Sequence, residues 1–133
     1  MWAPTKLLAP LTYTMGTFQV QLEVAGPARE RFLPVDALVD TGSTYTVLPR
    51  GLLRDLGVAV DRTARFVVAD GSEVELELGR AWVRFEGSQE YTLVVFGDHA
   101  LLGAVTLEEF LLAPDPVGGR LIPVPGLMMR VAA

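Results

Sequence analysis

Hydrophobic and polar residues alternate along several stretches of the chain with the period of two that is typical of half-buried β-strands. The alternation is strict over residues 18–24 and 73–78. An Asp-Gly pair before the second of these stretches is a strong hairpin signal. Other apolar or alternating runs predict four more strand segments, over residues 32–39, 63–68, 79–85 and 91–96.

Two segments have the spacing of short helices instead. Residues 49–56 begin with a proline, place three leucines on one face, and are followed by Gly57, which suits a left-handed C-cap. Residues 106–112 are expected to form a second helix, opened by a capping box of Thr106 and Glu109.

The C-terminal part of the chain contains two further apolar runs between Pro- and Gly-rich turns. Residues 120–124 and 127–131 are predicted to form an edge hairpin or an arm. The sequence shows no internal repeat and no linker long enough to separate domains. Residues 1–133 are therefore predicted to form a single domain.

Composition narrows the possible locations and partners. Half of the 133 residues are hydrophobic, as in a folded chain, yet no apolar run reaches the roughly 18 residues of a membrane span. The N-terminus lacks the pattern of a signal peptide, so we expect a cytoplasmic protein with no membrane partner. A net charge of −5 disfavours a nucleic-acid partner.

Two residue types that often carry chemistry are scarce. Cysteine is absent, which excludes disulfides, thiol nucleophiles and cysteine metal sites. His99 is the only histidine, so a His-rich zinc site or a Ser-His-Asp triad is implausible. We expect neither a metal nor an organic cofactor.

One acidic residue, Asp40, lies between two apolar stretches of the sequence. Asp40 follows the strand predicted over residues 32–39, and Thr41, Gly42 and Ser43 then lead into a second apolar run. An Asp-x-Gly sequence is common in turns and does not by itself imply a function. With these flanks, however, the stretch resembles the active-site strand and turn of aspartic proteases, particularly the small single-domain kind called retropepsin-like.

A second matching element strengthens the resemblance. In that family a later apolar strand ends in two hydrophobic residues and a glycine, and a helix follows. Leu101, Leu102 and Gly103 supply this motif here, followed by the helix predicted over residues 106–112. The resemblance covers residues 17–112 and implies an all-β, mostly antiparallel, closed barrel with a short helix after the second motif.

The resemblance also implies a reaction and an assembly. Retropepsin-like enzymes hydrolyse peptide bonds with a water that is activated between two aspartates, and a second copy of the chain supplies one of them. This sequence holds one Asp-Thr-Gly. The expected active form is therefore a homodimer in which Asp40 of each copy faces the other across a two-fold axis, acting on a peptide or protein substrate.

Other site residues follow from the same resemblance. Gly42 is expected to let the backbone approach the carboxylates, and Thr41 to hold the two turns together across the dimer axis. Ser43 is expected to donate a hydrogen bond to the outer oxygen of Asp40. Residues expected to line or underpin the substrate cleft, if they are not simply core, are Leu38, Leu101, Leu102 and Gly103.

The predicted hairpin turn falls where the family has its flap, a mobile cover over bound peptide. An ordinary exposed hairpin is the alternative. Near the site, Tyr45 either contacts substrate or packs, and Asp98 with His99 either borders a pocket or lies in a solvated loop. The expected flap tip is Ala69, Asp70, Gly71 and Ser72.

Two other functions remain open at this stage. One is a catalytically silent dimeric peptide-binding module of the same fold, with Asp40 as a turn former. The other is a monomeric β-barrel that binds a small ligand, with an accidental resemblance. The molecular mass in solution separates the monomeric barrel from the two dimeric proteins.

Overall fold

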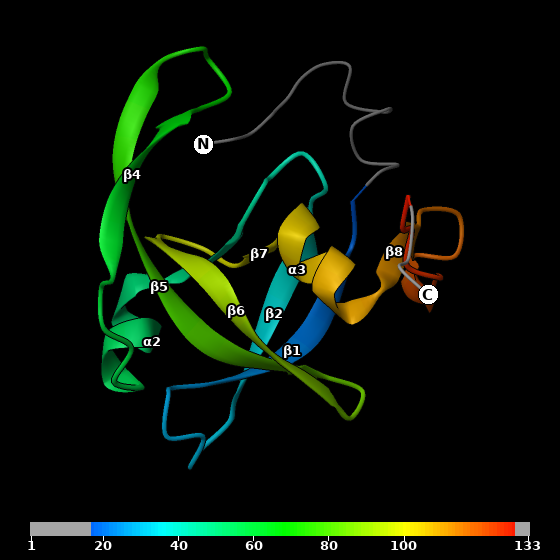
Figure 1. Ribbon diagram of the computed structural model, residues 1–133, viewed down its shortest axis with the longest axis horizontal. Coiled ribbons are helices and arrows are strands. Elements are labelled where there is room, and N and C mark those ends of the chain that lie inside the picture. The colour runs from blue at the N-terminus through cyan, green and yellow to red at the C-terminus, as the bar shows by residue number, and fades with distance from the viewer. Residues whose placement is uncertain (1–16, 130–133) are drawn as a thin grey trace.

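The computed structural model describes residues 17–129, and these fold into nine strands and two short helices (Figure 1). In chain order the elements are β1 (Gln19–Ala25), β2 (Leu33–Val39), β3 (Thr46–Pro49), α2 (Arg50–Asp55), β4 (Arg62–Val67), β5 (Glu73–Phe85), β6 (Ser88–Gly97), β7 (Leu101–Leu102), α3 (Ala104–Phe110), β8 (Leu112–Asp115) and β9 (Arg120–Pro123). The strand segments predicted between residues 18 and 96 are all present, and the two predicted over residues 73–85 form one continuous strand.

Seven strands form one closed sheet. Their order is β1-β2-β7-β3-β6-β5-β4, and an additional pairing of β1 with β5 closes the sheet into a barrel that leaves β4 outside. Paired strands are antiparallel except for β2 with β7 and β3 with β6. The predicted mostly antiparallel, closed barrel is confirmed.

The apolar side chains of the alternating pattern in β1 point into the barrel. Leu22 and Val24 are fully buried, whereas Gln19 and Gln21 are exposed. Val39, at the end of β2, joins the same core. Because burying each such side chain contributes about 1.5–3 kcal/mol, the period of two is enough to decide which face of a strand turns inward.

The hairpin of β4 and the first half of β5 extends beyond the barrel (Figure 1). Glu73 and Glu75 are exposed on it, while Val74 is half-buried, so the half-buried strand predicted from the alternation is confirmed. Further along β5, a Cβ atom at Gly79 would lie 2.5 Å from the carbonyl oxygen of Ala59. Only glycine lets β5 pass this segment on its way into the barrel.

Helix α3 begins earlier than the sequence predicts. It starts at Ala104, and Thr106 is fully buried inside it, so the expected capping box of Thr106 and Glu109 is wrong. The N–H groups of its first turn instead donate to the backbone carbonyls of Ser43 and Thr44. A side-chain cap is unnecessary because a distant segment of the chain already satisfies these donors.

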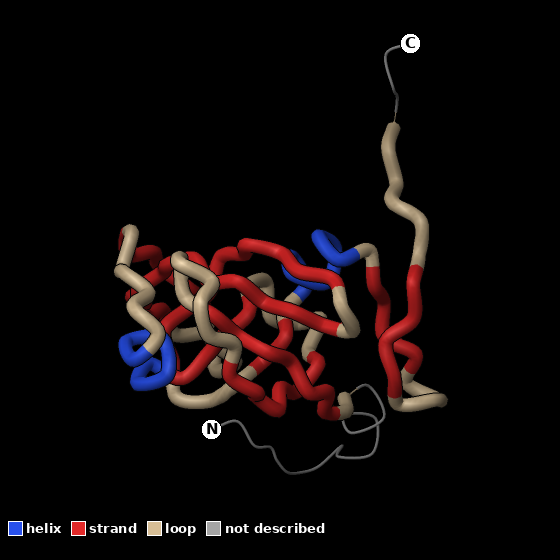
Figure 2. The backbone as a smooth tube through the Cα atoms, turned by 90° about the horizontal axis from the view of Figure 1, so that it is seen from below, coloured by secondary structure: helices blue, strands red, loops and turns tan. Residues whose placement is uncertain are grey.

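Of the hairpin and the arm predicted for the two C-terminal runs, the hairpin between those runs is wrong. β9 pairs with β8, and not with residues 127–131, of which 130 and 131 lie outside the described residues. Leu111, with a φ of 55°, turns the chain directly from α3 into β8. Strand β8 is therefore available to pair with β9. Figure 2 shows this hairpin and the segment after it standing away from the barrel.

Within residues 17–129, two features bear on whether the protein binds a membrane or a metal. No helix in this range combines the length and hydropathy needed to cross a membrane. Nor do three or more of its His, Asp or Glu side chains gather as a metal site requires. Residues 1–16, where no signal peptide is expected, lie outside the described part of the chain.

Candidate active site

Asp40 lies at the exit of β2, where the two sequence motifs meet. β2 runs parallel to β7, with Leu38 opposite Leu101 and Val39 opposite Leu102. The Asp40 N–H donates to the carbonyl oxygen of Leu102 at 3.0 Å, so the bonding continues one residue past the strands. The fold therefore brings together the two motifs that the sequence separates widely.

The turn after β2 fixes one oxygen of the Asp40 carboxylate. The Gly42 N–H donates to Asp40 Oδ1 at 2.9 Å, and the Ser43 N–H donates to the Asp40 carbonyl at 3.1 Å. A Cβ atom at Gly42 would lie 3.1 Å from Oδ1, so a side chain here would crowd the carboxylate. Asp40 is half-buried, and no described residue bonds its other oxygen, Oδ2.

Ser43 does not make the contact expected of it. Its hydroxyl donates to the carbonyl oxygen of Tyr45 at 2.7 Å. A serine hydroxyl carries one hydrogen, so it cannot also donate to Asp40. Ser43 therefore stabilises the exit of the turn, and the backbone of Gly42 supplies the donor to the carboxylate.

Gly103 is required by a close approach to that same exit. A Cβ atom there would lie 2.5 Å from the carbonyl carbon and oxygen of Tyr45 and 2.8 Å from the carbonyl oxygen of Ser43. Immediately after it, the Ala104 N–H donates to the Ser43 carbonyl at 2.8 Å. The second motif thus holds the Asp40 turn through backbone hydrogen bonds of the residues on both sides of Gly103.

The three leucines predicted at the cleft differ in accessibility. Leu102 and Leu101 are 2% and 8% exposed, whereas Leu38 is half-buried. Leu102 packs with Leu22 and Leu107 in the barrel core. In the single chain Leu101 and Leu102 thus underpin the site, and Leu38 alone of the three presents substantial surface.

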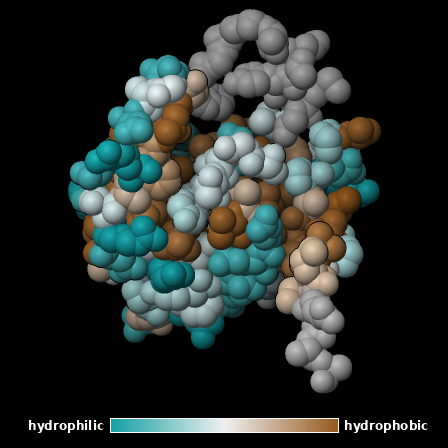
Figure 3. Space-filling model, turned by 45° about the horizontal axis from the view of Figure 1, so that its top comes forward, coloured by the Kyte–Doolittle hydropathy of each residue, from teal (hydrophilic) through white to brown (hydrophobic). Residues whose placement is uncertain are grey.

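The predicted flap tip is a compact, exposed turn. Asp70 Oδ1 accepts hydrogen bonds from the Ser72 hydroxyl at 2.6 Å and from the Ser72 N–H at 2.9 Å, and these bonds lower the pKa of Asp70. Gly71 has a φ of 87°, and Ala69 at the start of the tip is exposed like its neighbours. In Figure 3 the hairpin that ends in this tip is hydrophilic on its outer side, with hydrophobic surface toward the rest of the molecule.

An aromatic contact joins the hairpin of β4 and β5 to the Asp40 turn. The rings of Tyr45 and Phe66 meet edge to face, with centroids 6.0 Å apart. Tyr45 therefore packs in the single chain, one of the two roles considered for it. His99 and Asp98 are exposed, which favours the solvated-loop interpretation over a pocket border.

Two cavities open elsewhere on the molecule. One of about 650 Å³ is lined by Arg29, Glu30, Phe32, Arg84 and Gln89, and a second of about 350 Å³ lies beside it. Arg84 Nε donates to Glu23 at 2.8 Å, which lowers the pKa of that carboxyl. Neither cavity borders the Asp40 turn.

Comparison with known proteins identifies the family. A family model described as aspartyl protease matches residues 20–104, which include both motifs and the hairpin between them. The chain belongs to the aspartyl protease family. No curated protein matches it.

Two solved structures show how far the likeness extends. EIAV protease, solved in complex with an inhibitor, is 19% identical, and the match covers 78% of this chain and 90% of that one with a TM-score of 0.51. The simian foamy virus (mac) protease is 20% identical, with 71% and 99% covered and a TM-score of 0.49. The likeness to EIAV protease supports a retropepsin-like fold for this aspartyl protease family member.

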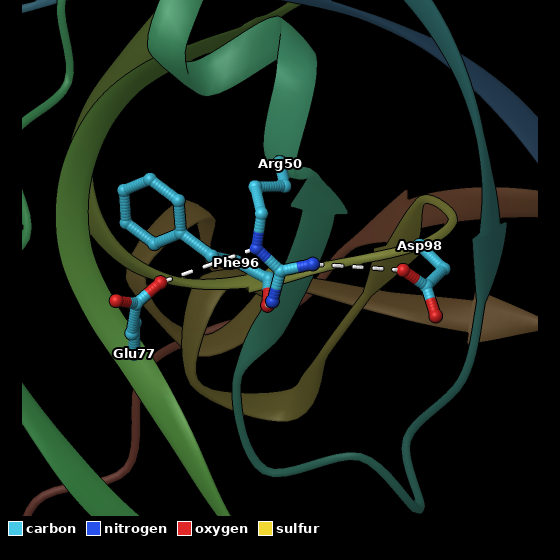
Figure 4. A network of polar contacts seen from close by, with 4 residues as sticks. All are labelled: Arg50, Glu77, Phe96 and Asp98. Atoms are coloured by element: carbon cyan, nitrogen blue, oxygen red, sulfur yellow. Dashed lines mark hydrogen bonds and ion pairs between the residues drawn. The ribbon is translucent and has the colours of Figure 1, made fainter.

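The contacts of one charged residue in this aspartyl protease domain were not predicted from the sequence. Arg50, at the start of α2, donates to the carbonyl oxygen of Phe96 at 3.1 Å. Its guanidinium also lies 4.0 Å from Glu77 of β5 and 3.7 Å from Asp98 (Figure 4). Arg50 thus links the base of the β4–β5 hairpin to the loop before β7, an arrangement that no local sequence signal indicates.

Proposed function

We propose that this chain is an active aspartic endopeptidase that hydrolyses peptide bonds as a homodimer. The supporting observation is the arrangement of Asp40, whose Oδ1 accepts the Gly42 N–H while Oδ2 has no partner among the described residues. A carboxylate held on one side and open on the other suits contact with water and with a second carboxylate. The single Asp-Thr-Gly means that the second carboxylate comes from another copy.

The proposed reaction uses two Asp40 side chains that share one proton. Two carboxylates at hydrogen-bonding distance cannot both ionise, so one is charged and one is protonated. The charged one takes a proton from water as the water oxygen attacks the peptide carbonyl carbon, and the protonated one donates a hydrogen bond to the carbonyl oxygen. The intermediate then collapses as a proton passes to the amide nitrogen, the C–N bond breaks, and an acid and an amine are released.

The hairpin of β8 and β9 is the proposed contact between the two copies. It pairs with no other described strand, and isolated two-stranded sheets are marginally stable in water. Leu112 and Leu121 pack on the barrel core, whereas Leu127 and Met129 are 94% and 99% exposed just beyond the hairpin. Pairing with the same hairpin of a second copy would cover these apolar side chains and the open strand edges.

The hairpin of β4 and β5 is the proposed cover over the bound peptide. It stands beyond the barrel, carries the exposed Val67 near its tip, and touches the active-site segment through Phe66 and Tyr45. A cover with few tertiary contacts can open for substrate and then close to exclude water.

Cleavage of a mixed peptide library, from acidic to neutral pH, tests the proposal. We expect the full-length chain to cut peptides and Asp40→Asn to be slower by about 1,000-fold or more, since the charged carboxylate is lost. Asp36→Asn is the matched control, because Asp36 lies exposed earlier on the same strand. A statine-type inhibitor should block the native protein.

The other candidate functions predict different results. If the native protein is dimeric and binds peptides but neither it nor Asp36→Asn cuts any of them, it is a silent peptide-binding module. A monomeric mass at every concentration, with no cleavage, supports the small-ligand barrel. If Asp40→Asn cuts as fast as the native chain, the two-aspartate mechanism is wrong.

A further inference from the structure

Three threonines stand out in the core because they are polar and fully buried. Thr46 of β3, Thr92 of β6 and Thr106 of α3 each have an exposed fraction of 0%. Within residues 17–129 they are the buried side chains that carry a polar group. A valine has nearly the same shape and would not have to place a hydroxyl away from water, so the hydroxyls call for a reason beyond packing.

The three hydroxyls, which we call the threonine cluster, bond to one another. Thr46 Oγ1 donates to Thr106 Oγ1 at 2.7 Å, and Thr92 Oγ1 lies 3.0 Å from Thr106 Oγ1. The oxygen of Thr46 also accepts the backbone N–H of Gly103 at 3.1 Å. The cluster therefore joins three separate elements and ends on the glycine of the second motif.

Gly103 stands between the cluster and both ends of the Asp40 turn. The residue before it, Leu102, accepts the Asp40 N–H, and the residue after it, Ala104, donates to the Ser43 carbonyl. A displacement of Gly103 would therefore move the start and the exit of the turn together.

We propose that Thr46 and Thr106 are positioning residues that set the place of Asp40 through Gly103, with Thr92 holding Thr106 from the other side. This inference rests on the proposed function, since it concerns the placement of the proposed catalytic carboxylate. In a two-fold dimer a displacement toward or away from the axis occurs in both copies, so it changes the separation of the two carboxylates by twice as much as either one moves. Reactions of this kind are sensitive to misplacements well below the length of a bond.

The test compares Thr106→Val with Thr106→Ser in the full-length chain. Valine removes the hydroxyl and keeps the shape, whereas serine keeps the hydroxyl and removes the methyl group. We expect kcat to fall about 10-fold in Thr106→Val with a smaller change in KM, and to stay near the native value in Thr106→Ser. The separation of the two limbs of the pH–rate profile should also change in Thr106→Val, because the interaction between two carboxylates depends on the distance between them.

A second measurement does not depend on catalysis. Amide hydrogen exchange at Gly103 and Asp40 should be faster in Thr106→Val than in the native protein and unchanged in Thr106→Ser. Faster exchange in a chain that cuts no peptide would support the positioning role and reject the proposed function. Unchanged exchange and unchanged kcat in Thr106→Val would overturn the positioning role while leaving the protease intact.

Two further variants cover a failure of Thr106→Val to fold. Thr46→Val removes the acceptor of the Gly103 N–H directly, and the same loss of kcat and protection is expected. Thr106→Ser should fold in any case, because it keeps every hydrogen bond of the cluster. If it folds with native exchange at Gly103 but loses kcat about 10-fold, methyl packing and not the hydroxyls positions the turn, and the proposal is wrong.

Discussion

The Asp40 turn and the flap tip are both short turns, but different parts of the chain hold them. Asp40 and Ser43 bond to Leu102 and Ala104, which lie far away in the sequence. The tip is held by its own residues, through the bonds from Ser72 to Asp70. Bonds from distant elements fix the position of a turn relative to the barrel, whereas local bonds fix only its shape.

This difference matches the two tasks proposed for the turns. A carboxylate that must meet its counterpart in another chain has to stay in place. A cover over the peptide has to keep its shape while its position changes. The following substitutions test whether the two turns are really held in these separate ways.

The largest effect is expected from Gly103→Ala. The added methyl group would meet the backbone of Tyr45 at 2.5 Å and of Ser43 at 2.8 Å, and backbone atoms cannot move aside like a flexible side chain. We expect the free energy of unfolding to fall by about 2 kcal/mol, as for an overpacked core, and peptide cleavage to fall with it. Urea denaturation measures the first and initial cleavage rates the second.

Gly51→Ala is the control for that experiment. Gly51 lies inside α2, and a Cβ atom there meets nothing within 4 Å. Alanine should stabilise the helix by about 0.5–1 kcal/mol. Equal losses of stability in both variants would show that the close contacts at Gly103 are not the cause.

A smaller effect is expected from Gly71→Ala at the flap tip. Space is open around Gly71, so the cost comes only from its φ of 87°, which an L-residue adopts at about 1–2 kcal/mol. Because the tip is held locally, the loss should appear as faster amide exchange within residues 69–72 and as a higher KM. Exchange at Asp40 that rises equally would contradict the separation of the two turns.

The smallest effect is a pH dependence confined to the tip. The Ser72 hydroxyl and N–H hold the pKa of Asp70 below its ordinary value. The ionised carboxylate therefore stabilises the turn at pH values above the ordinary pKa, and this contribution disappears as the pH falls through the lowered pKa of the folded protein. The NMR shift of the Ser72 amide should follow that titration.

Two variants check the assignment of that titration. Asp70→Ala should abolish it, whereas Glu75→Ala, on the same hairpin but outside the tip, should leave it in place. A Ser72 shift that titrates in Asp70→Ala would show that another group is responsible.

The sequence predicted the features that depend on local pattern. Period-two alternation located β1 and β5, and the Asp-Gly pair located the turn between β4 and β5, because both signals come from adjacent residues. The two motifs also lie side by side, at the ends of β2 and β7. These features are set by the burial of one strand face and by turn chemistry.

The features that were missed depend on contacts between distant segments. The start of α3 was misplaced because its N–H partners are carbonyls of Ser43 and Thr44, and Thr106, read as a cap, bonds inside the core. The donor to Asp40 was assigned to Ser43 because a side-chain hydroxyl is visible in a sequence and the backbone N–H of Gly42 is not. Arg50 gave no signal because its partners, Glu77, Phe96 and Asp98, are distant from it in the sequence.

The presence of a single Asp-Thr-Gly has a genetic consequence under the dimer proposal. Each active site would draw one aspartate from each of two gene products. A cell that makes equal amounts of native and Asp40→Asn chains would then hold only about a quarter of its dimers with both carboxylates, if the chains mix freely. Such an allele would act as a dominant negative, removing about three quarters of the native activity where gene dosage alone would remove half.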